Sequence, residues 1–414
     1  MVKLARYRLG DLIDVSRGQS LSGDNYSEHG EYIRLTLANF DYQNGGFKVD
    51  TQKKDIYYTG TIKSHCLLQE GDIITPLTEQ TPGLLGSTAR IPESGKYIQS
   101  GDIAIVKCKE GLIDPSFCYY LLPSKQVKSQ LAVGSQQTKI RHTSPDAIMA
   151  CVVDIPPLEE QKKIGEFLDT ITNKVMCNRQ QNEQIEKLAS LLYNYWFVQF
   201  DFPNESGKPY KTSGGSMVYN NLLKRDIPEG WEVKTLNCFA CYSEDQESNN
   251  KKGIYVSTDN MLPNKMGIIP SSVFPSYGTC TAFTPNDILI SNIRPYLKKI
   301  WLADREGACS NDVLCVKSLS EEMGNLIYMS LWQDAFFDYS MQGSKGTKMP
   351  RGDKDHIMSF PIIFPNNKRI IELFNHTINN GFGILSNNNK EIESLLAFQQ
   401  TVIPLFMSGQ MTII

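Results

Sequence analysis

The sequence has no run of apolar residues long enough to cross a membrane as a helix, and its first residues contain no apolar core of the kind that directs secretion. Residues 1–7 lead directly into a polar pattern. These absences argue against an integral helical membrane protein. They predict a cytoplasmic location and no membrane partner.

Histidine is scarce, and cysteine is not arranged as a metal ligand set. The 5 histidines are dispersed, and the 10 cysteines lie mostly in apolar, strand-like runs that are typical of buried reduced thiols. Cys238 and Cys241 have the spacing of a metal-binding pair, but no second pair and no nearby histidine accompany them. The sequence therefore predicts no metal site.

The motifs of the enzymes that act on nucleic acids are missing as well. We find no Asn-Pro-Pro-aromatic motif for amino-methylation, no glycine-rich cofactor loop after a strand and no GxxxxGK[ST] phosphate loop. Glu232 and Lys234 have the spacing of the end of a nuclease triad, but no plausible Pro-Asp precedes them. We therefore expect no catalytic residue and no bound cofactor in this chain.

An excess of positive charge is also absent. The chain has 42 lysines and arginines against 45 aspartates and glutamates, for a net charge of -3. This balance argues against a protein that coats nucleic acid indiscriminately, although local basic surfaces remain compatible with it. A length of 414 residues with 41% hydrophobic residues predicts a folded protein of two to three structural units.

A heptad pattern runs through residues 156–200. Apolar residues alternate at steps of four and three, and Asn178 and Asn182 interrupt the stripe near its middle. The a positions are Ile164, Ile171, Asn178, Ile185 and Leu192, and the d positions are Leu168, Val175, Asn182, Ala189 and Trp196. Buried asparagine weakens such a seam and fixes its register, so we expect a long helix that needs a partner.

The same pattern returns 207 residues later in the chain. Asn182 corresponds to Asn389, Ile185 to Ile392 and Leu188 to Leu395. Two such helices bury their stripes most simply side by side as a coiled coil.

The segments before the two helices also repeat. Trp231 to Leu236 echoes Tyr7 to Leu12, and Tyr255-Val256-Ser257 echoes Tyr32-Ile33-Arg34. The agreement is sharpest where residues 134–140 return as 343–349, at a spacing of 209. We expect strands at 32–35, 71–74 and 101–106, and a helix that begins at Pro115 after the capping residue Asp114. The plan is therefore domain, helix, domain, helix.

Two stretches of sequence resemble a known family. Residues 155–164, IPPLEEQKKI, resemble the segment that opens the long helices of type I restriction-modification specificity subunits. Residues 192–203, LYNYWFVQFDFP, with the continuation to Trp231, are similar to the central region of the same family. With the internal duplication, the resemblance covers essentially the whole chain.

The resemblance implies an α/β (α+β) fold with an internal pseudo-two-fold repeat. Two similar globular target recognition domains, residues 1–155 and 215–365, are expected to be separated by helical regions at 156–214 and 366–414. The two long helices are expected to form an antiparallel coiled coil.

The resemblance also implies a DNA-reading subunit without catalysis of its own. Each domain would read one half of a split double-stranded DNA sequence, and because the two loop sets differ, the target would be asymmetric. Two modification subunits, which methylate adenine with S-adenosylmethionine, are the implied partners. Restriction subunits that use ATP and Mg²⁺ for translocation and cleavage complete the implied complex.

The second helical region departs from the family pattern. Gly381 and Gly383 lie inside its heptads, and each costs about 1 kcal/mol relative to alanine in a helix interior. The segment before this helix has the single proline Pro365 and lacks the Pro-Leu-Glu-Glu-Gln sequence of the first copy. We therefore expect a kinked or looser second helix.

Candidate DNA-binding residues lie in loops that recur in both halves. Glycine permits close backbone approach, hydroxyl groups and lysines suit phosphates, and glutamine or arginine can read base edges. In the first half the candidates are Arg34, Asn39, Gln80, Ser135, Gln136, Gln137, Thr138, Lys139 and Arg141. In the second half they are Asn292, Arg294, Tyr296, Lys298, Ser344, Lys345, Thr347, Lys348 and Arg351.

Each candidate has an ordinary structural alternative. The loops have the composition of solvated turns, and the lysines near Tyr296 are compatible with a surface hairpin. The aromatic residues from Tyr193 to Phe202 lie at the end of an amphipathic helix, where anchoring against a domain or a partner is more usual than base stacking. Two other functions are compatible with the sequence, namely a protein-binding helical scaffold or assembly factor and the recognition subunit of an atypical restriction enzyme.

Overall fold

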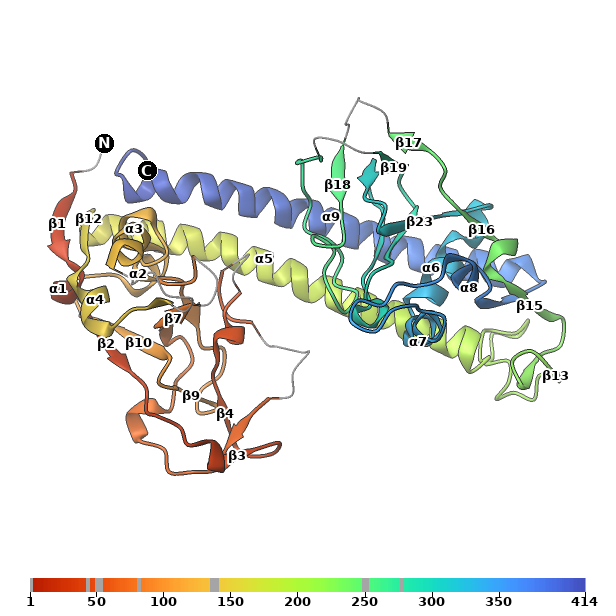
Figure 1. The fold of residues 1–414 in the computed structure, drawn as a ribbon, viewed down its shortest axis with the longest axis horizontal. Helices are drawn as coiled ribbons and strands as arrows, with labels where there is room; N and C mark the ends of the chain where they lie inside the picture. Colours follow the sequence, from red (N-terminus) through yellow and green to blue (C-terminus); the bar gives the residue numbers. More distant parts are fainter. Residues whose placement is uncertain are drawn as a thin grey trace. The chain divides into compact units, whose positions relative to one another are not determined.

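The computed structural model describes residues 3–41, 45–48, 55–79, 83–134, 141–247, 253–275 and 279–413. The chain divides into two compact units (Figure 1). Unit 1 contains Met1–Asn178 and Lys390–Ile414, and unit 2 contains Arg179–Asn389. Each of the two long helices thus contributes one segment to each unit. Among the described residues, no helix combines the length and the apolar character needed to cross a bilayer.

Unit 1 contains a mixed α/β domain built on two four-stranded sheets. The first sheet has the order β2 (Ile13–Arg17), β10 (Ile103–Cys108), β6 (Ile73–Pro76) and β8 (Ala89–Arg90). The second has the order β3 (Tyr26–Ser27), β5 (Tyr57–Tyr58), β4 (Tyr32–Arg34) and β9 (Tyr97–Ile98). Two smaller pairs join β1 (Ala5–Arg8) to β12 (Val152–Ile155) and β7 (Thr78–Glu79) to β11 (Arg141–His142). The short helices are α1 (Leu9–Leu12), α2 (Pro115–Leu121), α3 (Lys125–Gly134) and α4 (Pro145–Ala150).

Unit 2 contains a domain of the same design. One sheet has the order β16 (Ala240–Tyr242), β23 (Val313–Ser318), β20 (Ile288–Ser291) and β21 (Ile300–Leu302). The other has the order β17 (Gln246–Glu247), β19 (Cys280–Phe283), β22 (Gly307–Cys309) and β18 (Ile254–Val256). β15 (Trp231–Thr235) pairs with β24 (Pro361–Pro365), and β13 (Met217–Asn220) pairs with β14 (Arg225–Pro228). The short helices are α6 (Gly324–Trp332), α7 (Asp334–Gln342) and α8 (Lys354–Met358).

The internal repeat predicted from the sequence is confirmed by the strand pairing. β10 lies between β2 and β6 with antiparallel neighbours on both sides, and β23 lies between β16 and β20 in the same way. The expected strands and the helix at Pro115 are present, and the Asp114 carboxylate accepts the Phe117 N–H at 2.9 Å as its N-cap. β6 begins two residues later than predicted, because Gly71 adopts a positive φ of 82° in the preceding turn.

The predicted heptad seam is buried in unit 1. The long helices are α5 (Leu158–Tyr193), which continues as a π-helical turn over Asn194–Val198, and α9 (Lys368–Met407). The a and d side chains of the first half of α5 are at most 7% exposed; they are Ile164, Leu168, Ile171, Val175 and Asn178. Phe167 of α5 packs edge-on against Phe398 and Phe406 of α9. Asn178, which lies later in α5 than Phe167, donates at 2.7 Å to the carboxylate of Glu391, which lies earlier in α9 than Phe398. The two helices therefore run antiparallel here.

The two helices also run antiparallel in unit 2. Asn182 of α5 bonds to Asn389 of α9, while Trp196 and Phe197, in the turn that continues α5, pack against Phe374 near the start of α9. The aromatic residues at the end of α5 form part of the core. Phe200 and Phe202 are buried and contact Trp231 at the start of β15. The prediction that this cluster anchors a domain is confirmed, since all of its rings except that of the exposed Tyr195 lie in a hydrophobic core.

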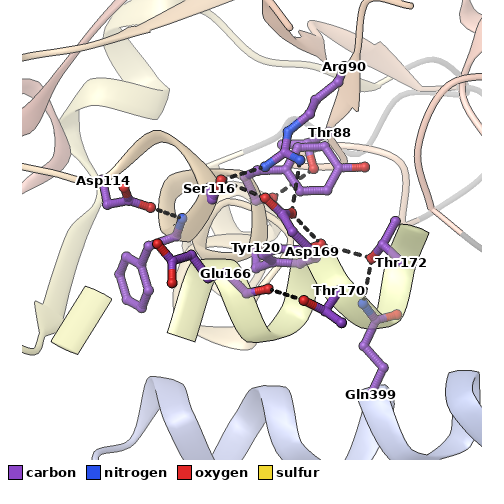
Figure 2. A network of polar contacts seen from close by, with 12 residues as sticks. Thr88, Arg90, Asp114, Ser116, Tyr120, Glu166, Asp169, Thr170, Thr172 and Gln399 are labelled. Atoms are coloured by element: carbon purple, nitrogen blue, oxygen red, sulfur yellow. Dashed lines mark hydrogen bonds and ion pairs between the residues drawn. The ribbon is translucent and has the colours of Figure 1, made fainter. Parts of the chain in front are cut away.

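A polar network attaches the domain of unit 1 to its helices (Figure 2). Asp169 of α5 forms an ion pair with Arg90 at 2.8 Å and accepts hydrogen bonds from Ser116 and Tyr120 of α2. The Tyr120 hydroxyl also lies 2.8 Å from Thr172, which accepts a bond from Gln399 of α9 at 3.0 Å. Burial raises the pKa of the Tyr120 hydroxyl, which stays protonated as a donor. The network fixes how the domain is oriented on the helix pair of unit 1.

The second long helix is not interrupted at its glycines. α9 continues through Gly381, Gly383 and Pro404 to Met407. The expectation of a kinked or looser helix stays a prediction. A Cβ atom at Gly381 would lie 3.1 Å from Cγ2 of Ile185, which shows that this glycine lets α5 approach closely. Gly383 has no atom within 4 Å of its Cβ position. Close packing therefore accounts for one of the two glycines.

Candidate nucleic-acid interface

A backbone frame brings two loops together in the domain of unit 1. The loop after β6 begins with Leu77, whose N–H donates to the carbonyl of Asp102 at 2.8 Å. The carbonyl of Leu77 accepts the N–H of Thr143, two residues before α4, at 2.8 Å. The loop that follows β6 and the loop that precedes α4 are thereby held side by side.

The same frame is present in the domain of unit 2. The N–H of Asn292, which follows β20, donates to the carbonyl of Asp312 at 2.9 Å. The carbonyl of Asn292 accepts the N–H of Gly352, two residues before α8, at 3.0 Å. The sequence predicts both loops as binding candidates in each half, and the structure adds that they meet. The short β7–β11 ladder of unit 1 corresponds to a single bridge between Ile293 and Arg351 in unit 2.

A buried carboxylate organises the first loop of unit 1. Glu79 is 3% exposed, and its Oε2 accepts the N–H groups of Gly83, Leu84 and Leu85 at 2.9, 2.8 and 3.0 Å. Its Oε1 lies 3.6 Å from Nη1 of Arg141. The predicted DNA-contacting Arg141 is thus already paired with a buried acid. The predicted residues Gln80, Ser135, Gln136, Gln137, Thr138 and Lys139 lie outside the described residues.

Arg34 and Asn39 take different positions. The guanidinium of Arg34 lies 4.8 Å from the ring centroid of Tyr26, and its Nε is buried without a hydrogen-bond partner in the described structure. Asn39 is 7% exposed, and its Oδ1 accepts the Thr36 N–H at 2.8 Å. The amide of Asn39 therefore stabilises a turn, and the predicted base contact by this residue stays a prediction.

The turn at Asn39 also corrects the repeat alignment. Asn260 accepts the N–H of Ser257 at 2.6 Å as Asn39 does for Thr36. The parallel strand pairs agree, because Arg34 lies opposite Ile98 and Tyr255 lies opposite Ala308. Tyr255 is therefore the counterpart of Arg34. The match of Tyr255 with Tyr32 that the sequence predicted is wrong by two residues.

The loop after β20 in unit 2 presents a basic and aromatic turn. Arg294 and Lys298 are both left-handed, with φ of 52° and 51°, and they flank a short 3-10 turn over Pro295–Leu297. Arg294 and Tyr296 are exposed, whereas Lys298 is held by Asp334 at 2.9 Å. The three predicted residues of this turn therefore differ in their freedom to meet a ligand.

The loop before α8 adds further predicted residues to the same region. Lys345 and Arg351 pair through their backbones, and the Lys345 ammonium donates to Asp353 at 2.7 Å. Arg351 donates to Asp312 at 2.6 Å. Thr347 and Lys348 are exposed. The Ser344 hydroxyl donates to the carbonyl oxygens of Ser340 and Met341 and so continues the end of α7.

The carboxylates that hold these cations were not predicted from the sequence. Asp353 is the N-cap of α8, and its hydrogen bond from Lys345 lowers its pKa to about 2. Asp312 lies in a segment of the second half that matches the first half in the internal repeat, and Glu79 is next to the candidate residue Gln80. The capping role of Asp353 before α8 could have been predicted from the sequence. The ion pairs of Glu79, Asp312 and Asp353 could not, because they depend on tertiary contacts.

The described residues contain no group of His, Cys, Asp and Glu side chains that could hold a metal ion. What the two loops can offer is hydrogen-bond donors and positive charge on a preformed backbone frame. Such groups contact phosphates and base edges in protein complexes with DNA.

The family model, the related sequences and the solved structure that this chain resembles all belong to type I restriction systems. Residues 1–187 match the family model described as the type I restriction modification DNA specificity domain. The chain is 32% identical over 196 residues to the MjaVIII specificity subunit of a type I restriction enzyme from Methanocaldococcus jannaschii, covering 45% of this chain and 44% of that protein. It is 30% identical over 128 residues to the MjaIX specificity subunit from the same organism, covering 31% of this chain and 27% of that protein. The matched segments thus span less than half of each of these relatives.

The fold is shared with a solved structure over nearly the whole chain. The crystal structure of the type I restriction-modification S subunit from M. genitalium aligns with a TM-score of 0.59 and 13% sequence identity, covering 97% of this chain and 95% of that one. At this identity the likeness concerns the fold.

Proposed function

Because this chain belongs to the family of type I restriction-modification specificity subunits, we propose that it reads a split, asymmetric DNA sequence for such a complex. Each domain reads one half-site through the two loops that its backbone frame brings together. The chain performs no chemistry itself.

One observation carries this proposal. The two domains hold their loops with equivalent backbone hydrogen bonds, from Leu77 to Asp102 and from Asn292 to Asp312, yet the side chains on the loops differ. A repeated frame with different side chains suits two readers of two different sequences. Identical protomers would instead require a palindrome, since the symmetry of the protein is mirrored in the site.

The partners follow from the family. Two modification subunits would bind S-adenosylmethionine and methylate adenine, and restriction subunits would bind ATP and Mg²⁺. These ligands belong to the partner subunits. The complex would work in the cytoplasm, where the cellular DNA of a bacterium or archaeon is accessible.

DNA binding by the complex should be sensitive to salt, because phosphate contacts release counterions. The net charge of -3 leaves part of the basic surface to be supplied by the modification subunits. Measuring the dependence of affinity on salt concentration, with and without the modification subunits, tests this division. Equal slopes would contradict it.

The decisive experiment is genome-wide sequencing of methylated adenine in cells that express this chain with its modification subunit. Cells that lack only this chain are the control. We expect a split motif with two unlike halves, which disappears in the control. If the motif persists without this chain, the proposed function is wrong.

A further inference from the structure

We propose that Arg294 reads a guanine in the half-site bound by the domain of unit 2, through a bidentate contact with the O6 and N7 atoms in the major groove. This inference rests on the proposed function. It adds the residue that determines specificity and the base that this residue selects.

The backbone around Arg294 is fixed before any ligand binds. The Arg294 N–H donates to the carbonyl of Pro350 at 2.8 Å, and its own carbonyl accepts the N–H of Leu297 at 2.9 Å. A second strand of chain supports the turn, because Asn264 and Lys265 donate to the carbonyls of Leu297 and Lys298, both at 2.8 Å. Arg294 has a φ of 52°, in the left-handed region that residues other than glycine rarely adopt.

Arg294 is the arginine of the described unit 2 loops that has no carboxylate partner, while Lys348 is a second exposed cation. Lys265 and Lys298 share the carboxylate of Asp334, at 2.6 and 2.9 Å. Lys345 is paired with Asp353 and Arg351 with Asp312, as described above. The guanidinium of Arg294 is exposed and has no hydrogen-bond or ion-pair partner in the described parts of the chain. Its five N–H donors are therefore available to a ligand.

The equivalent position in unit 1 supports the assignment by contrast. By the backbone frame, Arg294 corresponds to Glu79, which is 3% exposed and accepts three backbone N–H groups of its own loop. One domain thus uses this position to fix its loop. The other fixes the same loop by backbone contacts and leaves the position free to carry an exposed arginine.

Arginine suits a guanine better than a phosphate here. Its planar fork matches the paired acceptors O6 and N7 of guanine, and this contact is the commonest specific one in the major groove. A phosphate contact would supply affinity without base discrimination, so its loss would weaken binding about equally for all sequences. A guanine contact and a phosphate contact therefore predict different effects of replacing Arg294.

The first test compares Arg294→Ala and Arg294→Lys with wild type by methylated-adenine sequencing of the assembled complex. We expect both variants to lose about 5- to 150-fold discrimination at one G·C position of one half-site, with the gap and the other half-site unchanged. Arg369→Ala, which removes an exposed arginine at the start of α9, should leave the motif unchanged. Weaker methylation of all sites by Arg294→Ala, with the motif itself unchanged, would overturn the proposal in favour of a phosphate contact.

The second test does not depend on methylation. The wild-type complex is titrated with duplexes in which each guanine of the motif in turn is replaced by 7-deazaguanine, which lacks the N7 acceptor. We expect one replacement to weaken wild-type binding and to have no further effect on Arg294→Ala. Independent, multiplicative losses at every guanine would overturn the proposal, whereas the absence of any split motif for wild type would instead contradict the proposed function.

Discussion

Asn182 of α5 donates a hydrogen bond to Asn389 of α9 at 2.7 Å, and the two residues are copies of each other in the internal repeat, 207 positions apart. Their neighbours Gln181 and Asn388 are also copies separated by 207 positions, and they bond at 3.2 Å. In an antiparallel helix pair, a residue meets its own copy only where the two halves of the seam are symmetric. The asparagines therefore mark the register in which the helices of unit 2 are paired.

The asparagine pair should be energetically coupled. Asn182→Leu alone removes partners of both Asn388 and Asn389, so we expect a loss of about 1 to 3 kcal/mol in the free energy of unfolding. In the double variant Asn182→Leu with Asn389→Leu, an apolar contact replaces the bond, and we expect higher stability than in either single variant. Denaturant unfolding of the four proteins measures the coupling, and strictly additive effects would contradict it.

The two glycines of α9 should respond differently to alanine. Gly383→Ala meets no neighbouring atom and should raise the free energy of unfolding by about 1 kcal/mol, because alanine loses less backbone entropy than glycine. Gly381→Ala places a Cβ atom 3.1 Å from Ile185, so its gain should be smaller or reversed. Each variant is the control for the other in thermal unfolding. Equal gains would show that the close approach at Gly381 is not constrained.

Glu79→Gln should loosen the loop that follows β6 in unit 1. The amide lacks the negative charge that attracts three backbone N–H groups, and we expect a loss of about 1 to 3 kcal/mol for this buried acceptor. Hydrogen exchange of the Leu84 and Leu85 amides should accelerate. Glu93→Gln removes an exposed carboxylate that pairs with Lys96 and is the matched control, with little expected effect. Unchanged exchange at Leu84 and Leu85 in Glu79→Gln would refute the role of this residue.

The stability of the chain should fall as the pH rises from about 4.5 to 7 because of Glu186. Burial, followed by the nearby charge of Glu183, raises the pKa of Glu186 to about 7, while Lys265 opposes the shift. The folded protein thus binds a proton more tightly than the unfolded chain, so this contribution to stability is present below the ordinary pKa and is lost between about pH 4.5 and 7.

Glu186→Gln should remove this pH dependence. At pH 8 the variant should exceed wild type by about 1 to 3 kcal/mol in the free energy of unfolding, and at pH 4 the two should agree. Glu372→Gln, at an exposed position of α9, is the control. Denaturant unfolding at the two pH values decides, and an equal difference at both would show that ionisation of Glu186 is not the cause.

Much of the architecture is determined locally and is therefore visible in the sequence. The steps of four and three from Ile164 to Trp196 define an apolar stripe on any helix, whatever surrounds it. Asp114 caps α2 through a contact only three residues away. The repeat of residues 134–140 at 343–349 similarly located the candidate loops in both domains.

The arrangement of the site depends on contacts between distant residues, and these were decided by the tertiary structure. The sequence places Arg141, Arg294 and Arg351 alike among the candidate DNA-binding residues. The fold pairs Arg141 with Glu79 and Arg351 with Asp312, across separations that no local pattern encodes, and it leaves Arg294 exposed. The same holds for Gly381, whose cost in an isolated helix is visible in the sequence, whereas its close approach to Ile185 exists only once the two helices pack. Sequence thus determined the elements and their repetition, and packing determined which of these charges are paired with carboxylates.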